Sequence, residues 1–387
     1  MSLSINTNIT AMAAIRSLSM IANDTTRTQA RVESGLRINK ANDDPAVFTI
    51  AQNMRADLNG MAAVRDSLAF GKATLSVARD ASTKISDELG KLKQTITQGQ
   101  QQGLDSTQIN AQITNALANI DAYARSATFN GVNLMVNGVA GVAGVTTSNL
   151  GVVRDIQGAI TSLSGSNSTT SGAGSLNLSG LTVSQSAFEM TFSSSLDISD
   201  GDTVTITAGT RTVIFEFNDD ATGTLASTAS ATQDVYNVQF ASTDSTLARL
   251  GTMVTRMQQA GFNAAFTNDG RIIVSGGSMT ALAASNTDMT PTQIGGATGA
   301  IALVEAAIDT MGTRLATLGA TLRQVEGLQD FTKQLTDSVK EGLGSLVDAD
   351  LAEESARLTS LQTKQQLAVQ SLSIANQAPQ TLLGLFR

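Results

Sequence analysis

The chain of 387 residues contains no cysteine, no histidine and no tryptophan, and aromatic residues make up only 4% of it. Without cysteine there are no disulfides. Without histidine and cysteine, the side chains most often used for acid–base catalysis and for binding transition metals are missing as well. We therefore expect a non-enzymatic protein with no cofactor and no metal site, stabilised by aliphatic packing and helix length.

Three further features are missing from the sequence. Residues 1–6 lack a basic leader followed by an apolar core, so we expect no cleaved secretory signal peptide. No window approaches the roughly 20 apolar residues that span a bilayer, so we expect no membrane insertion. No basic patch is available to steer the chain toward nucleic acid, which we therefore exclude as a partner.

The negative charge is concentrated in the middle of the chain. The formal net charge is −8, and residues 141–300 contain no lysine, five arginines and twelve acids, which leaves the two ends almost neutral. Near-neutral ends can pack against copies of themselves, whereas an acidic middle repels its neighbours and stays solvated.

Both ends carry long seven-residue apolar patterns. The front pattern comprises Val47, Met54, Met61, Leu68, Leu75, Leu89 and Ile96, interrupted only by Ser82. The back pattern alternates spacings of three and four through Ile301, Val304, Ile308, Met311, Leu315, Leu318, Leu322 and Val325. Such spacing is typical of coiled-coil packing and predicts that the two ends lie together, with the middle inserted between them.

Start and stop signals place the helices. A weak amphipathic pattern covers residues 5–38, and its apolar positions are Ile5, Ile9, Met12, Ile15, Leu18 and Ile21. Asp44 followed by Pro45 predicts the start of a second helix that reaches Ile96, roughly 75 to 80 Å long. A third helix is predicted over residues 106–126. Helical pattern resumes after Pro291 and continues to about residue 376, with a break at 348–350.

The middle reads as a small α+β domain, with strands predicted at 202–207, 212–217 and 271–274 and a helix at 247–260. The predicted fold is mainly α, an elongated rod of long terminal coiled-coil-like helices with a projecting β-rich α+β insert. We expect three domains. They are an inner terminal-helix domain of 1–43 plus 349–387, a helical rod domain of 44–164 plus 291–348, and a surface insert of 165–290.

Several short motifs at both ends resemble bacterial flagellin, over about 140 residues at the front and 85 at the back. They are Ser4-Ile5-Asn6-Thr7-Asn8, Ser34-Gly35-Leu36-Arg37-Ile38-Asn39, Asp43-Asp44, Phe129-Asn130-Gly131, and Ala375-Asn376-Gln377-Ala378-Pro379-Gln380 before a Leu-rich end with Arg387. The middle resembles the family only in being variable, although residues 202–275 are similar to a flagellin-type insertion motif.

The resemblance implies a structural subunit that polymerises into the extracellular flagellar filament used for swimming. It also implies export by the flagellar export apparatus with a chaperone, and contact with hook-associated junction and cap proteins. Two alternatives stay open. A hook–filament junction protein would be scarce in sheared filaments, and a surface adhesin would bind a ligand through its isolated insert.

The residues expected to carry assembly come from the motifs and the helical patterns. They are Ile5, Asn6, Leu36, Arg37, Asn39, Asp43, Asp44, Pro45, Leu315, Leu318, Asn376, Pro379 and Arg387. Arg37 and Asn39 lie in a short polar stretch between two apolar runs. The resemblance favours a connection between inner and outer helical layers, with Arg37 bridging carboxylates or carbonyls, over an ordinary turn.

Enzymatic and metal-binding interpretations are weaker. Some flagellins resembling this chain carry a metalloprotease in the insert, but its His-Glu-x-x-His motif cannot exist here. Gly71-Lys72 has neither the first glycine nor the Ser or Thr of a phosphate loop. Asp197, Asp200 and Asp202 lack the glutamate that completes a calcium loop, and Asp43 beside Asp44 is better explained as a helix cap.

The resemblance also implies an altered patch for innate immune recognition. Flagellins sensed by the Toll-like receptor for this family present an Arg, a Leu four residues later, and a Glu on the next helix. Aligned through Leu89 and Ile113, this chain has Lys91, Thr95 and Gln112 at those positions. We therefore expect weak receptor activation.

Overall fold

A computed structural model describes residues 8–101, 105–172, 174–193, 197–219, 230, 232–241, 243–267, 270–276 and 278–385, with side chains described as far as residue 377 in the last helix. The chain forms two compact units, residues 1–65 with 330–387, and residues 66–329. The helices α2 (Pro45–Gln98) and α5 (Gly296–Val347) contribute residues to both units.

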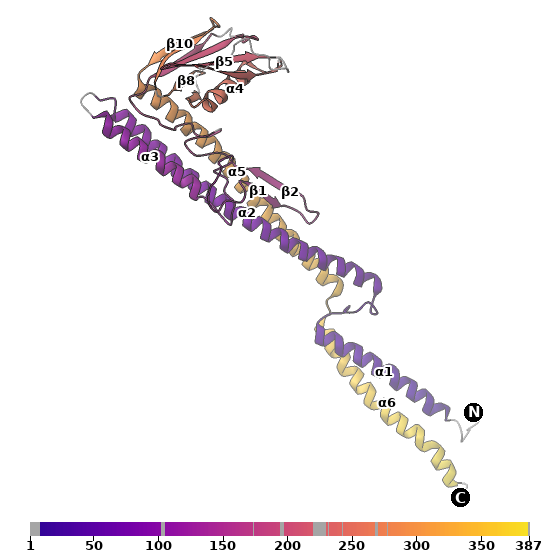
Figure 1. The fold of residues 1–387 in the computed structure, drawn as a ribbon. Helices are drawn as coiled ribbons and strands as arrows, with labels where there is room; N and C mark the ends of the chain where they lie inside the picture. Colours follow the sequence, from indigo (N-terminus) through magenta and orange to yellow (C-terminus); the bar gives the residue numbers. More distant parts are fainter. Residues whose placement is uncertain are drawn as a thin grey trace. The chain divides into compact units, whose positions relative to one another are not determined.

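Helices α1 (Ile9–Ser34) and α6 (Leu351–Leu385) lie side by side in the first unit (Figure 1). The Asn8 side chain accepts from the Ala11 amide at 3.0 Å and begins α1. Gly35 ends it at φ 70, a left-handed conformation that costs glycine little. The helix is thus shorter than the predicted 5–38, because Gly35 stops it before residue 38.

Asp44 caps the start of α2, and Asp350 caps the start of α6. The Asp44 carboxylate accepts from the amides of Ala46 and Val47 at 3.0 and 3.1 Å, and α2 then runs for 54 residues. The Asp350 carboxylate accepts from two amides of the first turn of α6. The predicted break at 348–350 is confirmed, because α5 ends at Val347 and α6 begins at Leu351.

The second unit contains antiparallel helices. Lys72 pairs with Glu326 at 2.9 Å and Lys93 with Glu305 at 2.7 Å, so residue numbers fall along α5 as they rise along α2. Helix α3 (Ser106–Ser126) lies beside α2, where the Asn119 amide donates to Glu88 at 3.2 Å. The large fully buried apolar residues of α2 and α3 are Leu68, Leu75, Ile85, Leu89, Leu92, Ile96, Ile113 and Ile120.

Ser82, the one polar residue in the front apolar pattern, is also fully buried. Its hydroxyl donates to the Ala78 carbonyl at 2.7 Å and lies 3.4 Å from the Met135 sulfur. The serine therefore keeps its place in the core by satisfying its hydroxyl within its own helix, so the pattern continues through it.

A two-stranded hairpin, β1 (Asn149–Val153) and β2 (Ile160–Ser164), packs on the second unit's helices. Gly71 explains how closely it approaches α2, because a Cβ at that position would lie 2.5 Å from a Val152 methyl group. The Val153 amide donates to Ser67 at 3.0 Å. Gly71 therefore serves close packing of a strand against a helix.

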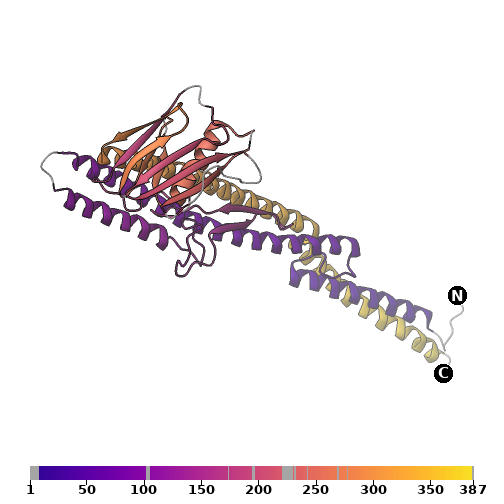
Figure 2. The ribbon, with the colours of Figure 1, turned by 45° about the horizontal axis from the view of Figure 1, so that its top comes forward.

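The rest of the second unit is a β-rich module of two four-stranded sheets and one helix (Figure 2). Strand orders are β10-β3-β8-β7 and β6-β5-β4-β9. The bounds are β3 Ala187–Phe192, β4 Thr203–Ala208, β5 Arg211–Asn218, β6 Gln233–Gln239, α4 Thr246–Gln259, β7 Asn263–Phe266, β8 Ile272–Ser275, β9 Met279–Ala284 and β10 Met289–Ile294. Helix α4 contacts β7 of one sheet and β6 and β5 of the other, and shares their core.

Pro291 lies in a strand, where we had expected helical pattern to resume. It belongs to β10, the edge strand that pairs antiparallel with β3, and α5 begins only at Gly296. A proline lacks the amide that a central strand would need, so the edge is where a sheet tolerates it. The mainly helical fold with a β-rich middle is confirmed.

Candidate assembly site

The connection after α1 is joined by backbone hydrogen bonds to the end of α5 and to the connection between α5 and α6. The amides of Arg37 and Ile38 donate to the Val347 carbonyl at 2.7 and 3.3 Å, and the Ala349 amide donates to Gly35 at 3.0 Å. Ile38, Ala51 and Val347 form a small buried cluster there, with Leu36 half-buried against it. The connection between α1 and α2 is thus tied to the connection between α5 and α6.

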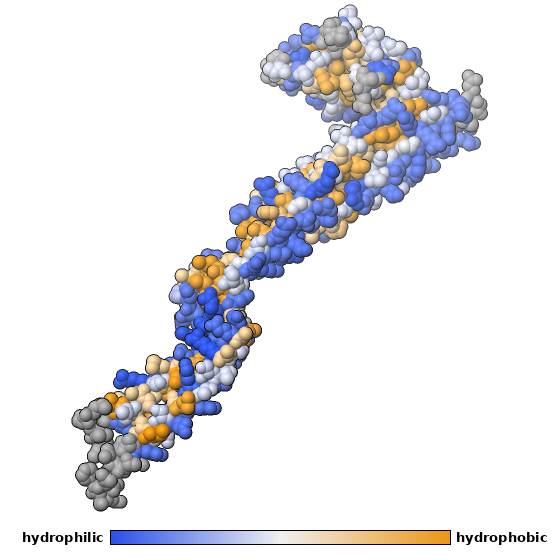
Figure 3. Space-filling view, turned by 180° about the vertical axis from the view of Figure 1, so that it is seen from behind, coloured by the Kyte–Doolittle hydropathy of each residue, from blue (hydrophilic) through white to orange (hydrophobic). Residues whose placement is uncertain are grey.

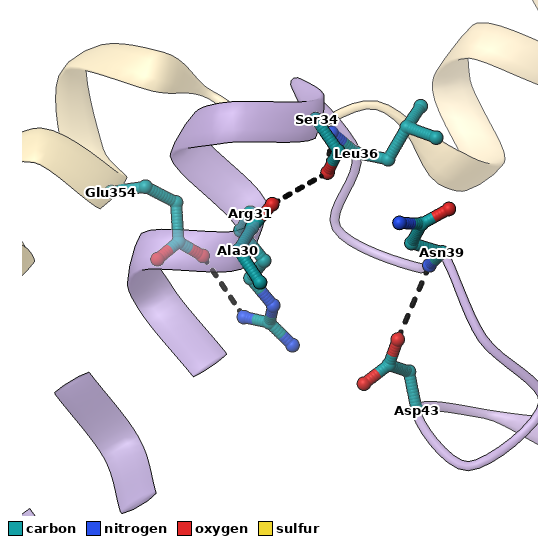
Figure 4. A network of polar contacts seen from close by, with 7 residues as sticks. All are labelled: Ala30, Arg31, Ser34, Leu36, Asn39, Asp43 and Glu354. Atoms are coloured by element: carbon teal, nitrogen blue, oxygen red, sulfur yellow. Dashed lines mark hydrogen bonds and ion pairs between the residues drawn. The ribbon is translucent and has the colours of Figure 1, made fainter. Parts of the chain in front are cut away.

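Arg37 was expected to bridge carboxylates or carbonyls, and in the structure its side chain binds a carbonyl. Its Nη2 donates to the Leu346 carbonyl at 2.7 Å, while the side chain as a whole is exposed. Asn39 is also exposed, and its amide donates to the Asp43 carboxylate at 3.2 Å (Figure 4). The Asp43 carboxylate also accepts from the Lys40 amide at 3.0 Å.

These amides lower the pKa of Asp43 below its ordinary value of 3.8. The Lys40 amide is the largest cause, and the Asn39 amide and the positive charges of Arg27 and Arg31 act in the same direction. Partial burial opposes them. Asp43 therefore closes the turn 39–43, and Asp44 caps the helix that begins at Pro45.

A partly buried ion pair joins α1 to α6. Arg31 Nη1 lies 2.9 Å from Glu354 Oε1, with side-chain exposures of 22% and 10% (Figure 4). The Arg31 Nε and Glu354 Oε2 atoms are buried without a hydrogen-bond partner. The ion pair therefore makes only one of the two parallel hydrogen bonds that an arginine and a carboxylate can form, because the guanidinium contacts a single carboxylate oxygen.

The large apolar residues of α1 and α6 are mostly exposed, and they interrupt the polar surface of the terminal helices (Figure 3). They are Ile9, Met12, Ile15 and Met20 on α1, and Leu351, Leu367, Val369 and Ile374 on α6. The residues that α1 buries are the small ones, Ala11 and Thr28. The apolar stripe expected on α1 is therefore not buried as a whole. Small residues let α6 approach this helix, whereas the larger apolar residues stay exposed.

The other expected assembly residues lie in different surroundings. Leu318 is buried at 7% exposure and Leu315 is half-buried on α5, while Asn376 is exposed on α6. Ile5, Asn6 and Arg387 lie outside the described residues, as does the side chain of Pro379.

The three residues of the expected receptor patch lie on α2 and α3. Lys91 is 71% exposed, and its ammonium lies 3.2 Å from Glu88. Contacts of Glu88 with Asn119 and of Gly99 with Ile109 make the two helices antiparallel, which places Thr95 level with Gln112. The structure therefore brings these two positions together on neighbouring helices.

The three aspartates considered for calcium belong to turns of the β-rich module. The Asp202 carboxylate accepts from the Ser199 amide at 2.8 Å and from the Asn286 side chain at 2.8 Å. In the described part of the chain, no group of three or more acidic side chains is arranged to hold a metal ion. No helix among the described residues is long and apolar enough to cross a membrane.

Sequence reasoning missed a buried polar segment, residues 167–172 and 174–178, which we call the strap. Its buried polar members are Asn167, Ser168, Thr169, Thr170, Ser175 and Asn177. Asp121 of α3 accepts from the Thr170 amide and hydroxyl at 2.7 and 3.1 Å, and Arg314 of α5 donates to the Asn167 carbonyl at 2.6 Å. A Ser- and Thr-rich run gives no local signal of burial, because its partners are far away in sequence.

The chain has long terminal helices with exposed apolar residues and a β-rich middle. This architecture is typical of a structural protein built mainly from helices. The N-terminal helical region of bacterial flagellin matches residues 5–140, and the C-terminal helical region of bacterial flagellin matches residues 301–386. The chain belongs to the bacterial flagellin family, and it is a structural subunit of the flagellar filament. The expected resemblance is confirmed.

Similar proteins match along the whole chain. Flagellin B of Rhizobium meliloti is 32% identical over 403 residues, covering 99% of this chain and 100% of the relative. Flagellin FljM of Caulobacter vibrioides is 29% identical over 384 residues, covering 99% and 98%. The crystal structure of Xanthomonas campestris FlgL is 10% identical, covers 76% of this chain and 99% of that one, and has a TM-score of 0.36.

Proposed function

We propose that this flagellin assembles with copies of itself into the extracellular filament that drives swimming. The observation that carries the proposal is the set of exposed apolar residues on α1 and α6, including Ile9 at 71% and Ile374 at 66% exposure. Exposed apolar residues gathered on helices that already pack together are typical of surfaces that another protein covers.

A helical polymer follows from such faces when one copy contacts the next through different surfaces. A head-to-tail interface whose rotation does not close produces an open filament instead of a ring. A terminal helix such as α1, which buries small residues in the monomer, is marginal alone and gains stability when a neighbour covers its larger apolar side chains.

We further propose that the chain leaves the cell through the flagellar export apparatus with a chaperone, without a cleaved signal peptide. At the growing filament it then meets hook-associated junction and cap proteins. These partners follow from the family, and the weak apolar packing of α1 favours a chain that stays easy to unfold before it assembles.

The test compares two substitutions on α1. Ile15→Asp places a carboxylate on an exposed apolar position that the proposal buries in the filament, whereas Ser17→Asp adds the same charge at an exposed polar position on a different side of the helix. Burying an unpaired carboxylate costs several kcal/mol. We expect Ser17→Asp monomers to form filaments in electron micrographs and Ile15→Asp monomers to fail. Normal filaments from Ile15→Asp would refute the proposed role of this face.

A further inference from the structure

Arg314, on α5, is a half-buried cation with no carboxylate beside it. Its Nη1 donates to the Asn167 carbonyl at 2.6 Å and the Ser168 hydroxyl at 2.9 Å, and its Nη2 donates to the Gly174 carbonyl at 2.8 Å. No acid in the described part of the chain lies within ion-pair distance of it. Burial lowers the pKa of Arg314 below its ordinary value, as expected for a charge that neutral acceptors leave uncompensated.

The donors of Arg314 that remain open form a defined edge. A guanidinium has five N–H groups, and three are used by two carbonyls and one hydroxyl of the strap. The two left over are on Nε and Nη2. These two atoms form the side-on fork that binds a carboxylate with two parallel hydrogen bonds.

A cavity of about 200 Å³ adjoins this residue. Its apolar walls come from three leucines, Leu134, Leu163 and Leu318, and Thr313 and Thr317 contribute on either side of Arg314. The cavity is half open to the surface. Its lining suits an acidic side chain whose methylene groups contact leucine while its carboxylate reaches the guanidinium.

We propose that the Arg314 cavity binds the carboxylate of an aspartate or glutamate from a second copy of this chain. Charge complementarity favours this occupant, because residues 141–300 of each neighbour carry twelve acids against five arginines and therefore offer acids in excess to a positive charge. The proposal rests on the proposed self-assembly. It assigns Arg314 a role between subunits in addition to its contacts with the strap.

The experiment measures the critical concentration, the monomer concentration that remains in equilibrium with filaments. Arg314→Gln removes the charge and the fork, and Arg314→Lys keeps the charge without the fork. Ser168→Ala is the matched control, since it removes one strap contact and leaves the guanidinium intact. At about pH 7 we expect a roughly tenfold increase for Arg314→Gln and a smaller one for Arg314→Lys.

Ser168→Ala should leave the critical concentration nearly unchanged, because the strap contact exists in monomer and filament alike. If Ser168→Ala has the same effect as Arg314→Gln, Arg314 only clamps the strap and the proposal is wrong. If wild-type monomers form no filament, the proposed function itself fails. If wild type and Arg314→Gln assemble equally well, only this inference fails.

A pH series distinguishes the proposed contact with a carboxylate from a purely structural role of Arg314, which would not depend on the protonation of a partner carboxylate. Pairing lowers the pKa of the partner carboxylate, so its contribution is present above an ordinary value of about 4 and is lost as the carboxylate protonates below that. The ratio of critical concentrations between Arg314→Gln and wild type should therefore shrink between about pH 7 and about pH 4. A ratio that stays constant contradicts the proposal.

Sodium acetate, compared with sodium chloride at equal ionic strength, identifies the source of the carboxylate. Acetate competing for the cavity should raise the critical concentration of wild type and leave that of Arg314→Gln unchanged. If acetate instead raises the melting temperature of wild-type monomer while Arg314→Gln assembles normally, the cavity binds a free carboxylate, and the second copy is excluded as the occupant.

Discussion

At the scale of single residues, the connection between α1 and α2 depends on two neighbouring aspartates with different duties. Asp44 caps the helix, and Asp43 binds the amides of Lys40 and Asn39 in the turn before it. Treating the pair as a catalytic dyad would require the two carboxylates to face one proton. Each instead faces backbone N–H groups of its own turn or helix start.

Asp43 makes a pH-dependent contribution to the stability of this turn. Its pKa is lowered in the folded chain, so the stabilisation is present above an ordinary value of about 4 and disappears as the pH falls through the lower folded pKa. We expect Asp43→Asn to remove this dependence and to cost at most about 1 kcal/mol at neutral pH, because the carboxylate is exposed. Amide hydrogen exchange of Lys40 measures it, and identical pH profiles in both proteins would contradict it.

The receptor patch gives a second prediction at this scale. Lys91 replaces the guanidinium fork by an ammonium, Thr95 cannot fill an apolar pocket, and Gln112 weakens hydrogen bonds by losing the charge. We expect wild-type monomer to be a poor agonist in a receptor reporter cell. Changing Lys91→Arg, Thr95→Leu and Gln112→Glu together should improve it. Strong signalling by unmodified protein would show that the alignment does not identify the patch.

At the scale of elements, α5 illustrates how one apolar pattern serves two environments. Leu318 is buried at 7% exposure and lines the Arg314 cavity, whereas Leu315, three residues earlier, is half-buried. Both positions belong to the same pattern in the sequence, but only one of them is enclosed within its own subunit.

The two leucines should therefore respond differently in the monomer. Leu318→Ala should cost about 2–3 kcal/mol of unfolding free energy, near the lower end for a buried leucine because a cavity already adjoins it. Leu315→Ala should cost less than about 1.5 kcal/mol, since it is only half-buried. Urea denaturation of monomer gives both values. Equal losses would mean that the burial of these positions has been assigned wrongly.

Leu315→Asp is correspondingly the cleaner probe of assembly. It should leave the monomer folded and prevent filament formation, whereas Leu318→Asp should already destabilise the monomer by several kcal/mol. Electron microscopy together with circular dichroism separates the two effects. Filaments of normal length from Leu315→Asp would remove Leu315 from the interface.

At the scale of the whole molecule, the β-rich module is tied into the chain by neighbouring strands. Ala187 at the start of β3 pairs with Ile294 at the end of β10, so the entry and exit of the module lie opposite each other. Ala187 also packs against α5, because a Cβ at Gly299 would lie 2.2 Å from its own. The module can be excised at this point without stretching the chain that remains.

We predict that deleting residues 188–293 and joining the ends with a short turn leaves filament assembly intact. Deleting residues 165–290, the insert as the sequence alone delimits it, removes the strap and leaves the last residues of β10 without β3. That deletion should lower the melting temperature of the monomer and impair assembly. Failure of the first deletion in an otherwise folded protein would show that the module itself holds the filament together.

The sequence determined the features that depend on neighbouring residues. Asp44 followed by Pro45 specified a helix start, and the seven-residue spacing identified the buried faces of α2 and α5. These signals are local, because a cap and a helical repeat are both decided within a few residues of chain. Long helices therefore made most of the fold predictable.

Only the tertiary structure decided the features whose partners lie far away in the chain. It buried the strap through Asp121 and Arg314, placed Pro291 at a sheet edge, and left Ile15 exposed although it belongs to an apolar helical pattern. Each outcome depends on which distant surface comes close and how large the side chains between them are. Periodicity names a face of a helix, but the size of the facing residues decides whether that face is covered.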